Sequence, residues 1–432
     1  MRDLAVILFI FGMVPFMIKK PWIGVLMAIW ISVMNPHRFG WGFAGEMPVF
    51  LVALAATIIG MMTTRERMRL PINGTTLLLI LLPLWMTVTL IFAFNFPDAL
   101  ERWNSVMKIF FFILVTAMVM QTRKHIDWMI WVLVFSVGFF GVKGGLFTIA
   151  TGGSSKVYGP PGDGYISDNN AISVALVMII PLAYYLSQYA KQRLVKYGLY
   201  ATIALSAVAV LGSHSRGAFL AVVVMSVFLF IKSRRKFLLG LLLAAALPFA
   251  ITAMPDSWKD RMRTVETYEE DTSAMGRINS WHAAFNIANE RPLIGGGFEL
   301  YSPEVFARYA PNPEDVHSAH SIYFQMLGEH GYVGLFLFLG LFVVGWLNAR
   351  RIIAFVQDKP DMAWAGDVAR AMQVSLVGFA VGGAFVNIGY WELQYFELVA
   401  LMVVWNAIRA PAPNVATVNR PGAVVPKAGA RV

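Results

Sequence analysis

Three short polar segments in an otherwise apolar chain carry the residues best suited to chemistry. They are 213–217, 275–282 and 317–323, and each adjoins a long apolar stretch. Together they hold arginines and four of the seven histidines. Arginine pairs with phosphate oxygens through a permanently charged fork. Histidine titrates near neutrality and can accept a proton from an attacking hydroxyl. The combination favours a transfer reaction in which arginines stabilise a departing diphosphate without a metal.

The same histidines allow a different interpretation. His317 and His320 are three residues apart, so on a helix both could face one metal ion, with Glu329 or His330 as a third ligand. The surroundings are cationic and poor in carboxylates, which argues against a divalent cation. We therefore predict no metal site and no cofactor.

The serines and arginine of the first segment also have alternatives. Ser213 and Ser215 do not occupy the Gly-x-Ser-x-Gly turn of a hydrolase nucleophile. Arg216 could extend to lipid phosphates at the membrane surface and do no more. A histidine at a helix start is commonly a cap or a surface residue.

The composition indicates which elements must position these residues. The chain has 432 residues, of which 58% are hydrophobic and 14% are charged. Soluble domains carry about 25% charged residues, so a water-soluble enzyme is excluded. The absence of cysteine excludes disulfides, thiolate metal sites, Fe–S clusters and a cysteine nucleophile.

Apolar stretches long enough to cross a bilayer recur along the chain, and a span needs about 20 residues. Two short stretches, 4–18 and 22–34, are separated by Lys19, Lys20 and Pro21, and we interpret the first as a retained span. The clear candidates are 47–62, 75–96, 105–120, 126–150, 171–188, 197–212, 217–231, 236–251, 331–353, 368–385 and 393–408. We expect an all-α polytopic membrane protein with 12 or 13 transmembrane helices.

Basic residues fall in alternate connections between these spans, which is the pattern of cytoplasmic loops. Topology thus accounts for the net charge of +10, and no nucleic-acid partner is implied. The basic groups are Lys19/Lys20, Arg65/Arg67/Arg69, Arg123/Lys124, Lys191/Arg193/Lys196, Lys232/Arg234/Arg235/Lys236, Arg350/Arg351/Lys359 and the C-terminal Arg409, Arg420, Lys427 and Arg431. The opposite side carries the long connections 35–46, 95–104, 151–170 and 252–318.

We predict four regions: an N-terminal bundle (1–251), a large external loop (252–319), C-terminal spans (320–410) and a disordered tail (411–432). The loop has helix-like stretches at 278–289 and 303–309 and a glycine turn at 295–297. Trp258 and Trp281 are expected to anchor it at the membrane surface. The interior of the spans is expected to be nearly free of charge.

The spacing of the polar segments resembles a known family. His320-Ser321 followed after nine residues by Gly331-x-x-Gly334 is similar to the signature of bacterial O-antigen ligases. The Ser-Arg-Gly-Ala run at 215–218 and the Arg…Trp…Pro-x-x-Gly-x-Gly run at 277–297 resemble further motifs of that superfamily. The first third of the chain resembles ligases associated with exosortase systems.

The resemblance implies a metal-independent, inverting glycosyltransferase of the GT-C type in the bacterial inner membrane. Its donor would be a glycan on undecaprenyl diphosphate, and its acceptor a hydroxyl of the lipid A–core oligosaccharide, both at the periplasmic face. His320 would act as the general base or orient the acceptor hydroxyl. Arg216 and Arg277 would bind and stabilise the diphosphate.

Four further residues are weaker candidates for substrate binding. His317 and Tyr323 are close to His320 along the chain, and either shapes the pocket or caps the helix. Tyr158 and Asn169 could contact sugar, although a turn followed by an N-cap also explains their segment.

Three other functions stay open. An O-antigen polymerase and a protein O-oligosaccharyltransferase would use the same donor and motifs with another acceptor. A transporter of lipid-linked sugar predicts charged or broken helices at mid-membrane.

Overall fold

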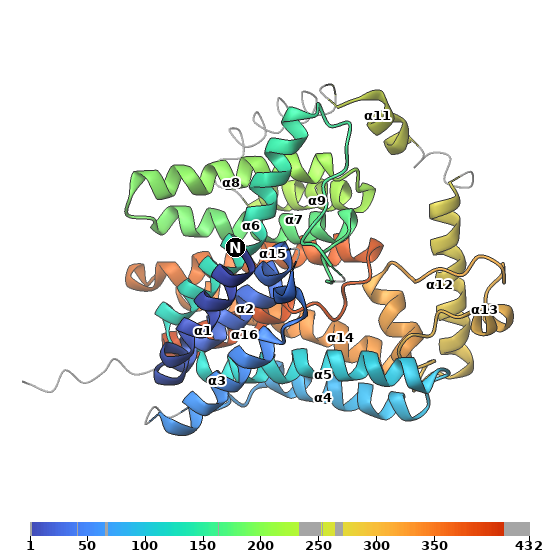
Figure 1. Ribbon diagram of the computed structural model, residues 1–432, viewed down its shortest axis with the longest axis horizontal. Coiled ribbons are helices and arrows are strands. Elements are labelled where there is room, and N and C mark those ends of the chain that lie inside the picture. Colours follow the sequence, from blue (N-terminus) through green and yellow to red (C-terminus); the bar gives the residue numbers. More distant parts are fainter. Residues whose placement is uncertain are drawn as a thin grey trace, which may run out of the picture.

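The computed structural model describes residues 2–40, 42–64, 68–162, 164–232, 252, 254–263 and 271–409. Every regular element within these ranges is a helix (Figure 1), which confirms the all-α prediction. The predicted span 236–251 and the tail 411–432 lie outside the described residues.

Twelve helices correspond to the remaining predicted spans. They are α1 (Arg2–Lys19), α2 (Pro21–Met34), α3 (Val49–Thr63), α4 (Gly74–Ile91), α5 (Phe96–Val119), α6 (Arg123–Ala150), α7 (Asn169–Tyr189), α8 (Arg193–Gly212), α9 (Arg216–Lys232), α14 (Ile322–Phe355), α15 (Ala363–Gly382) and α16 (Leu393–Arg409). Short 3-10 turns precede or follow several of them: η1 (Pro36–Phe39), η2 (Phe43–Glu46), η4 (Pro360–Met362) and η5 (Gly383–Phe385).

Seven helical segments in the described ranges are long and apolar enough to cross a membrane. They are α4 to α8, α14, and the run from η4 through α15 to η5. The helices α2 and α3 and the segment Arg216–Ile231 are apolar but shorter. The chain is therefore a multi-pass helical membrane protein.

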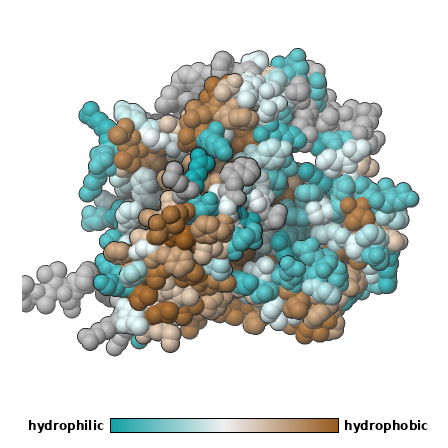
Figure 2. Space-filling view, viewed as in Figure 1, coloured by the Kyte–Doolittle hydropathy of each residue, from teal (hydrophilic) through white to brown (hydrophobic). Residues whose placement is uncertain are grey.

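The helices pack as a bundle whose centre contains α7 and α16, because both are buried on nearly every side. The surface seen in Figure 2 has a broad hydrophobic area over the N-terminal helices and hydrophilic areas beside it. An apolar outer surface is what a lipid environment requires.

The predicted external connections meet one another. The Val157 amide donates to Gly212 O at 3.0 Å, and the Phe94 amide donates to Gly296 O at 2.8 Å. These bonds join segments far apart in sequence. The large loop contributes α11 (Asp256–Arg263), α12 (Thr272–Glu290) and α13 (Pro303–Tyr309), so both predicted loop helices are present. Figure 1 shows α12 and α13 together at one side of the bundle, near the start of α14.

Trp258 and Trp281 bond within the protein: their indole N–H groups donate to Leu211 O at 3.0 Å and Ala319 O at 2.7 Å. Three buried acids, Glu329, Glu392 and Glu397, lie at or near the starts of α14 and α16, and only Glu397 falls within a predicted span. Each is hydrogen-bonded, which a pattern of apolar runs does not reveal.

Candidate functional site

A cavity lies between the first half of α12 and the segment that leads into α14. Its volume is about 870 Å³. Arg277, His317 and His320 all line it, so three of the predicted residues share one cavity. The remaining lining residues are Thr272, Ser273, Met275, Asn312, Glu314, Asp315, Val316 and Ser318.

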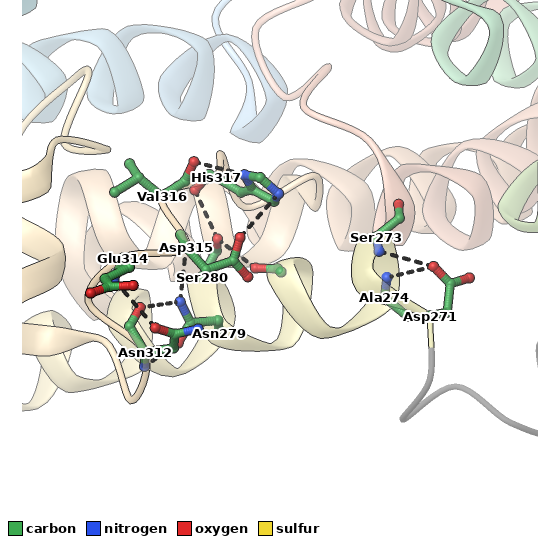
Figure 3. A network of polar contacts seen from close by, with 11 residues as sticks. Asp271, Ser273, Ala274, Asn279, Ser280, Asn312, Glu314, Asp315, Val316 and His317 are labelled. Atoms are coloured by element: carbon green, nitrogen blue, oxygen red, sulfur yellow. Dashed lines mark hydrogen bonds and ion pairs between the residues drawn. The ribbon is translucent and has the colours of Figure 1, made fainter.

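Helix α12 holds the histidine-bearing segment in place through side chains on one face. Asn279 Nδ2 donates to Asn312 O at 2.8 Å and to Asp315 O at 3.0 Å. Ser280 Oγ donates to His317 O at 2.8 Å (Figure 3). Since these bonds use the carbonyl groups of the segment, they fix its path whatever its side chains do.

A glycine allows the closest approach between the two segments. A Cβ atom on Gly276 would lie 2.3 Å from His317 Cδ2, so a larger residue there would displace that imidazole. Residues 314–320 form no helix, because α14 begins at Ile322. The idea that His317 and His320 face one metal from a shared helix is therefore wrong.

His320 is the last residue before the cap of α14 and has a left-handed backbone, with φ of 43°. The next amide, of Ser321, donates to Asn387 Oδ1 at 3.2 Å, which holds the turn between His320 and α14 in place. Burial lowers the pKa of the His320 imidazole, and the charge of Arg277 lowers it further. Asp168 acts in the opposite direction. Because the net shift is downward from 6.5, the imidazole is neutral at pH 7 and can accept a proton.

Arg216, the first residue of α9, is bonded to Asp271, the residue that caps α12. Its Nη1 donates to Asp271 Oδ2 at 2.5 Å, and both side chains are about five-sixths buried. Asp271 also caps α12 by accepting from the amides of Ser273 and Ala274. Burial alone would raise the pKa of Asp271, but the hydrogen bond and charge of Arg216, with the two amides, hold it below its ordinary value.

The cap brings the two predicted arginines to one end of α12. Arg277 is six residues after Asp271, which corresponds to about 9 Å along a helix axis. Arg216, bonded to Asp271, therefore lies near the same end, while His320 lies against Arg277 across the cavity. Arg216 is not among the described residues that line this cavity. The fold therefore brings His320 and Arg277 to one cavity and places Arg216 at the helix end that precedes the lining residues Thr272 and Ser273.

The weaker candidates lie in different environments. His317 lines the cavity, with Nε2 3.3 Å from Asp315 Oδ1. Tyr323 donates its hydroxyl to Ala380 O at 2.7 Å and so joins α14 to α15. Asn169 is buried and donates to Ser213 O at 2.8 Å, which ties the start of α7 to the segment before Arg216. Tyr158 lines a separate cavity.

Sequence reasoning missed the acids of this site. Asp271 neutralises Arg216, Asp315 pairs with His317, and Asp168 acts on His320. Asp271 had a local signal, because aspartate before Thr-Ser and a helical stretch is a common N-cap. Its contact with Arg216 had none, since the two residues are 55 positions apart.

The two glycine motifs form one structural unit. The amides of Gly296 and Gly297 donate to the carbonyls of Gly328 and Glu329 at 2.8 and 2.9 Å. Gly331 has φ 66° and ψ −170° and interrupts α14. A Cβ atom there would lie 2.5 Å from Leu293 O, so glycine is required both by conformation and by space. The motif spacing thus reflects how the loop is attached to α14.

The residues considered as a third metal ligand belong to another network. The Tyr390 hydroxyl donates to Glu329 Oε2 and is 2.7 Å from His330 Nε2. His330 Nδ1 is 2.7 Å from Thr89 Oγ1. Among the residues that the structure describes, no group of three His, Cys, Asp or Glu side chains could hold a metal ion.

The fold and the site define a multi-pass helical membrane protein with a polar, histidine-bearing cavity beside its large loop. Residues 201–339 match the family model described as O-antigen ligase, which spans the three polar segments. Residues 1–191 match a family of unknown function (DUF5935). No curated protein matches the chain. The O-antigen ligase match supports glycosyl transfer of the ligase or polymerase type in O-antigen synthesis.

Proposed function

We propose that this protein is an O-antigen ligase of the bacterial inner membrane. It transfers a glycan from undecaprenyl diphosphate to a hydroxyl of the lipid A–core oligosaccharide, with inversion at the anomeric carbon and without a metal. The large loop and its cavity face the periplasm. The narrower relation to exosortase-associated ligases stays a prediction, because the first 191 residues match a family whose function is unknown.

The roles follow from charge and protonation. Neutral His320 accepts the proton of the acceptor hydroxyl as that oxygen attacks the anomeric carbon. The bond to the diphosphate breaks as the new glycosidic bond forms, and Arg216 and Arg277 stabilise the negative charge that leaves with the diphosphate. His317, Tyr158 and Asn169 stay candidate sugar contacts. For Tyr323 we favour support of the His320 turn.

One observation carries the proposal: His320 and Arg277 line a single cavity within the segment that matches the ligase family. A desolvated neutral base beside a guanidinium is suited to a reaction that removes a proton and expels an anion. The cavity is large enough for several sugar units to enter from the loop side.

The decisive experiment combines purified full-length protein, a defined undecaprenyl-diphosphate glycan and three acceptors. The acceptors are lipid A–core, a second lipid-linked glycan and a serine-containing peptide. We expect product with lipid A–core only. Product with the second glycan would show a polymerase, and product with the peptide a protein glycosyltransferase.

The variant His320→Ala tests the base. We expect it to lose transfer to every acceptor while its thermal midpoint stays near that of the wild type. His282→Ala is a matched control, because His282 lies on α12 but does not line the cavity. Wild-type transfer by His320→Ala would reject the role of the imidazole.

The arginines are tested by Arg216→Lys and Arg277→Lys. Lysine keeps the charge but not the planar fork, so we expect donor KM to rise and kcat to fall. Full activity of both variants would mean that simple charge attraction suffices and would reject a bidentate grip.

A further inference from the structure

A cationic site lies outside the proposed catalytic cavity, in the N-terminal part of the chain. Two adjoining cavities of about 490 and 590 Å³ share Phe39, Gly40 and Lys143 in their walls. Every lining residue of both falls between Arg2 and Ser167. The pair therefore belongs wholly to the segment that matches a family of unknown function.

Two cations from different segments converge on the first of these cavities. Arg38 comes from η1, and Lys143 comes from α6, seven residues before the end of that helix. Within the described ranges neither side chain has an ion-pair partner. A lysine in a membrane helix can reach the headgroup layer alone. That explanation does not account for a second cation that another segment holds at the same cavity, because like charges repel.

The charge balance of the two cavities favours an anion. Arg2, Arg38 and Lys143 contribute positive charge, and among the described residues that line the two cavities Asp3 is the one acid. His37 adds no charge at pH 7, since burial, and then the charge of Arg38, lower its pKa. Asp3 lies in the second cavity beside Arg2, so the anion is best placed in the first.

The walls and surroundings favour a lipid over a soluble anion. Phe39, Phe139 and Phe140 line the cavities next to the cations. The bordering helices expose apolar side chains, including Leu8 (62% exposed) on α1 and Leu146 (55% exposed) on α6. Acyl chains can lie along these outward faces while the headgroup occupies the polar cavity.

We infer that the N-terminal segment binds a phosphate-bearing lipid, with the headgroup phosphate between Arg38 and Lys143 and the chains along α1 and α6. The backbone of the 158–162 loop closes the other side of the headgroup cavity. Gly162 is favoured there because its φ of 94° is one that residues with a Cβ atom rarely adopt. This binding does not depend on the proposed transfer reaction.

The test is lipid binding by the full-length protein in a zwitterionic detergent. A ligand that binds the native state raises the thermal midpoint, and the stabilisation grows with the logarithm of its concentration once that concentration exceeds Kd. Titration with phosphatidylglycerol should raise the midpoint at concentrations where phosphatidylcholine does not. Inorganic phosphate over the same range should have little effect, because it lacks the chains.

Variants locate the site. Lys143→Met and Arg38→Gln should each weaken the apparent Kd for phosphatidylglycerol about tenfold, which corresponds to about 1.4 kcal/mol. Lys108→Met is the matched control, since Lys108 is an exposed lysine of another membrane helix and lines neither cavity. Only variants whose midpoint without lipid equals that of the wild type are compared, and either one suffices if the other does not fold.

Three results would overturn the inference. They are equal stabilisation by the two phospholipids, unchanged affinity in Lys143→Met and Arg38→Gln, or an inorganic phosphate effect equal to that of phosphatidylglycerol. The last would indicate a site for a soluble anion. Since the readout is binding, failure here leaves the transfer reaction untouched.

Discussion

His320 has a backbone and an environment that suit a base. Burial and the charge of Arg277 keep the pKa of its imidazole below 6.5, so the neutral form predominates at pH 7 and is lost only as the pH falls through this lowered pKa. We expect the pH dependence of kcat/KM to show an acid limb below the ordinary histidine range. Replacing Arg277 by Gln removes one cause of the shift, so the limb should move to higher pH. An unmoved limb in Arg277→Gln would contradict this account.

Asp271 forms an ion pair with Arg216, whose guanidinium we assign to the donor diphosphate. In Asp271→Asn the amide still caps α12, because asparagine is as good an N-cap as aspartate. The charge on Arg216 then lacks this counter-charge, so we expect a lower donor KM. Loss of a charged hydrogen bond should cost about 1–3 kcal/mol of stability.

Steady-state kinetics with varied donor measure this effect, and Asp315→Asn is the control because Asp315 pairs with His317 instead. A donor KM that rises in Asp271→Asn would show that the carboxylate aids binding and does not compete.

The sequence revealed the catalytic candidates at this scale because their types are rare in an apolar chain. His320, Arg277 and Arg216 could be selected by type and spacing. Their acidic neighbours could not, since an aspartate at the surface of a loop is common and its partner is set only by the fold.

Glycine residues allow the large loop to attach closely to α14. In Gly331→Ala the new Cβ would meet Leu293 O and Pro292 O at 2.5 and 2.6 Å. The backbone conformation alone costs a residue with a Cβ about 1–3 kcal/mol. We expect a clear drop in thermal midpoint together with loss of transfer. Gly340→Ala, where the nearest atom is 3.4 Å away, should leave both nearly unchanged.

Helix α12 positions the histidine segment through Asn279. Asn279→Ala removes two bonds to carbonyl groups and should cost about 1–3 kcal/mol. Asn286→Ala removes a comparable bond to Tyr309 O at the end of α13. We expect both variants to lose stability but only Asn279→Ala to lose most of its transfer rate, measured at a temperature where both are folded. Equal rates would show that the segment holds its path without α12.

The helices were predictable because a backbone in lipid must satisfy its own hydrogen bonds, so a long apolar run has to be helical. The predicted span at 331–353 begins where α14 is interrupted at Gly331. The helical segment before it, from Ile322, was not predicted, because Glu329 and His330 interrupt the apolar pattern while pairing with Tyr390.

Across the whole molecule, a buried polar cluster joins the two family-matched segments. Arg102 of α5 lies 3.5 Å from Glu299 of the loop, and its guanidinium lies 5.9 Å from the centre of the Tyr390 ring. Tyr390 in turn bonds Glu329. No sequence pattern links these residues, since their proximity exists only in the assembled bundle.

Arg102→Met should therefore destabilise the full chain. Removing one partner of a wholly buried pair costs about 3–5 kcal/mol, and the cost here is smaller because the Arg102 side chain is 32% exposed. In a Glu299→Gln background the same change should cost less, because the ion pair is already lost. Thermal midpoints of the four proteins measure the coupling, and additive effects would show that the two groups do not interact.

Helix α14 consists of two parts, because the φ of 66° and ψ of −170° at Gly331 are not helical. The 24 residues from Tyr332 to Phe355 extend about 36 Å, which is enough to cross a hydrocarbon layer about 30 Å deep. If Arg350 and Arg351 stand among the headgroups, that layer ends near Gly331, and the segment Ile322–His330 lies at its surface as a separate part. The bend at Gly331 then sets the position of His320 relative to the lipid. Under the proposed reaction, an acceptor that cannot reach that position stays unmodified, however well its terminal sugar fits.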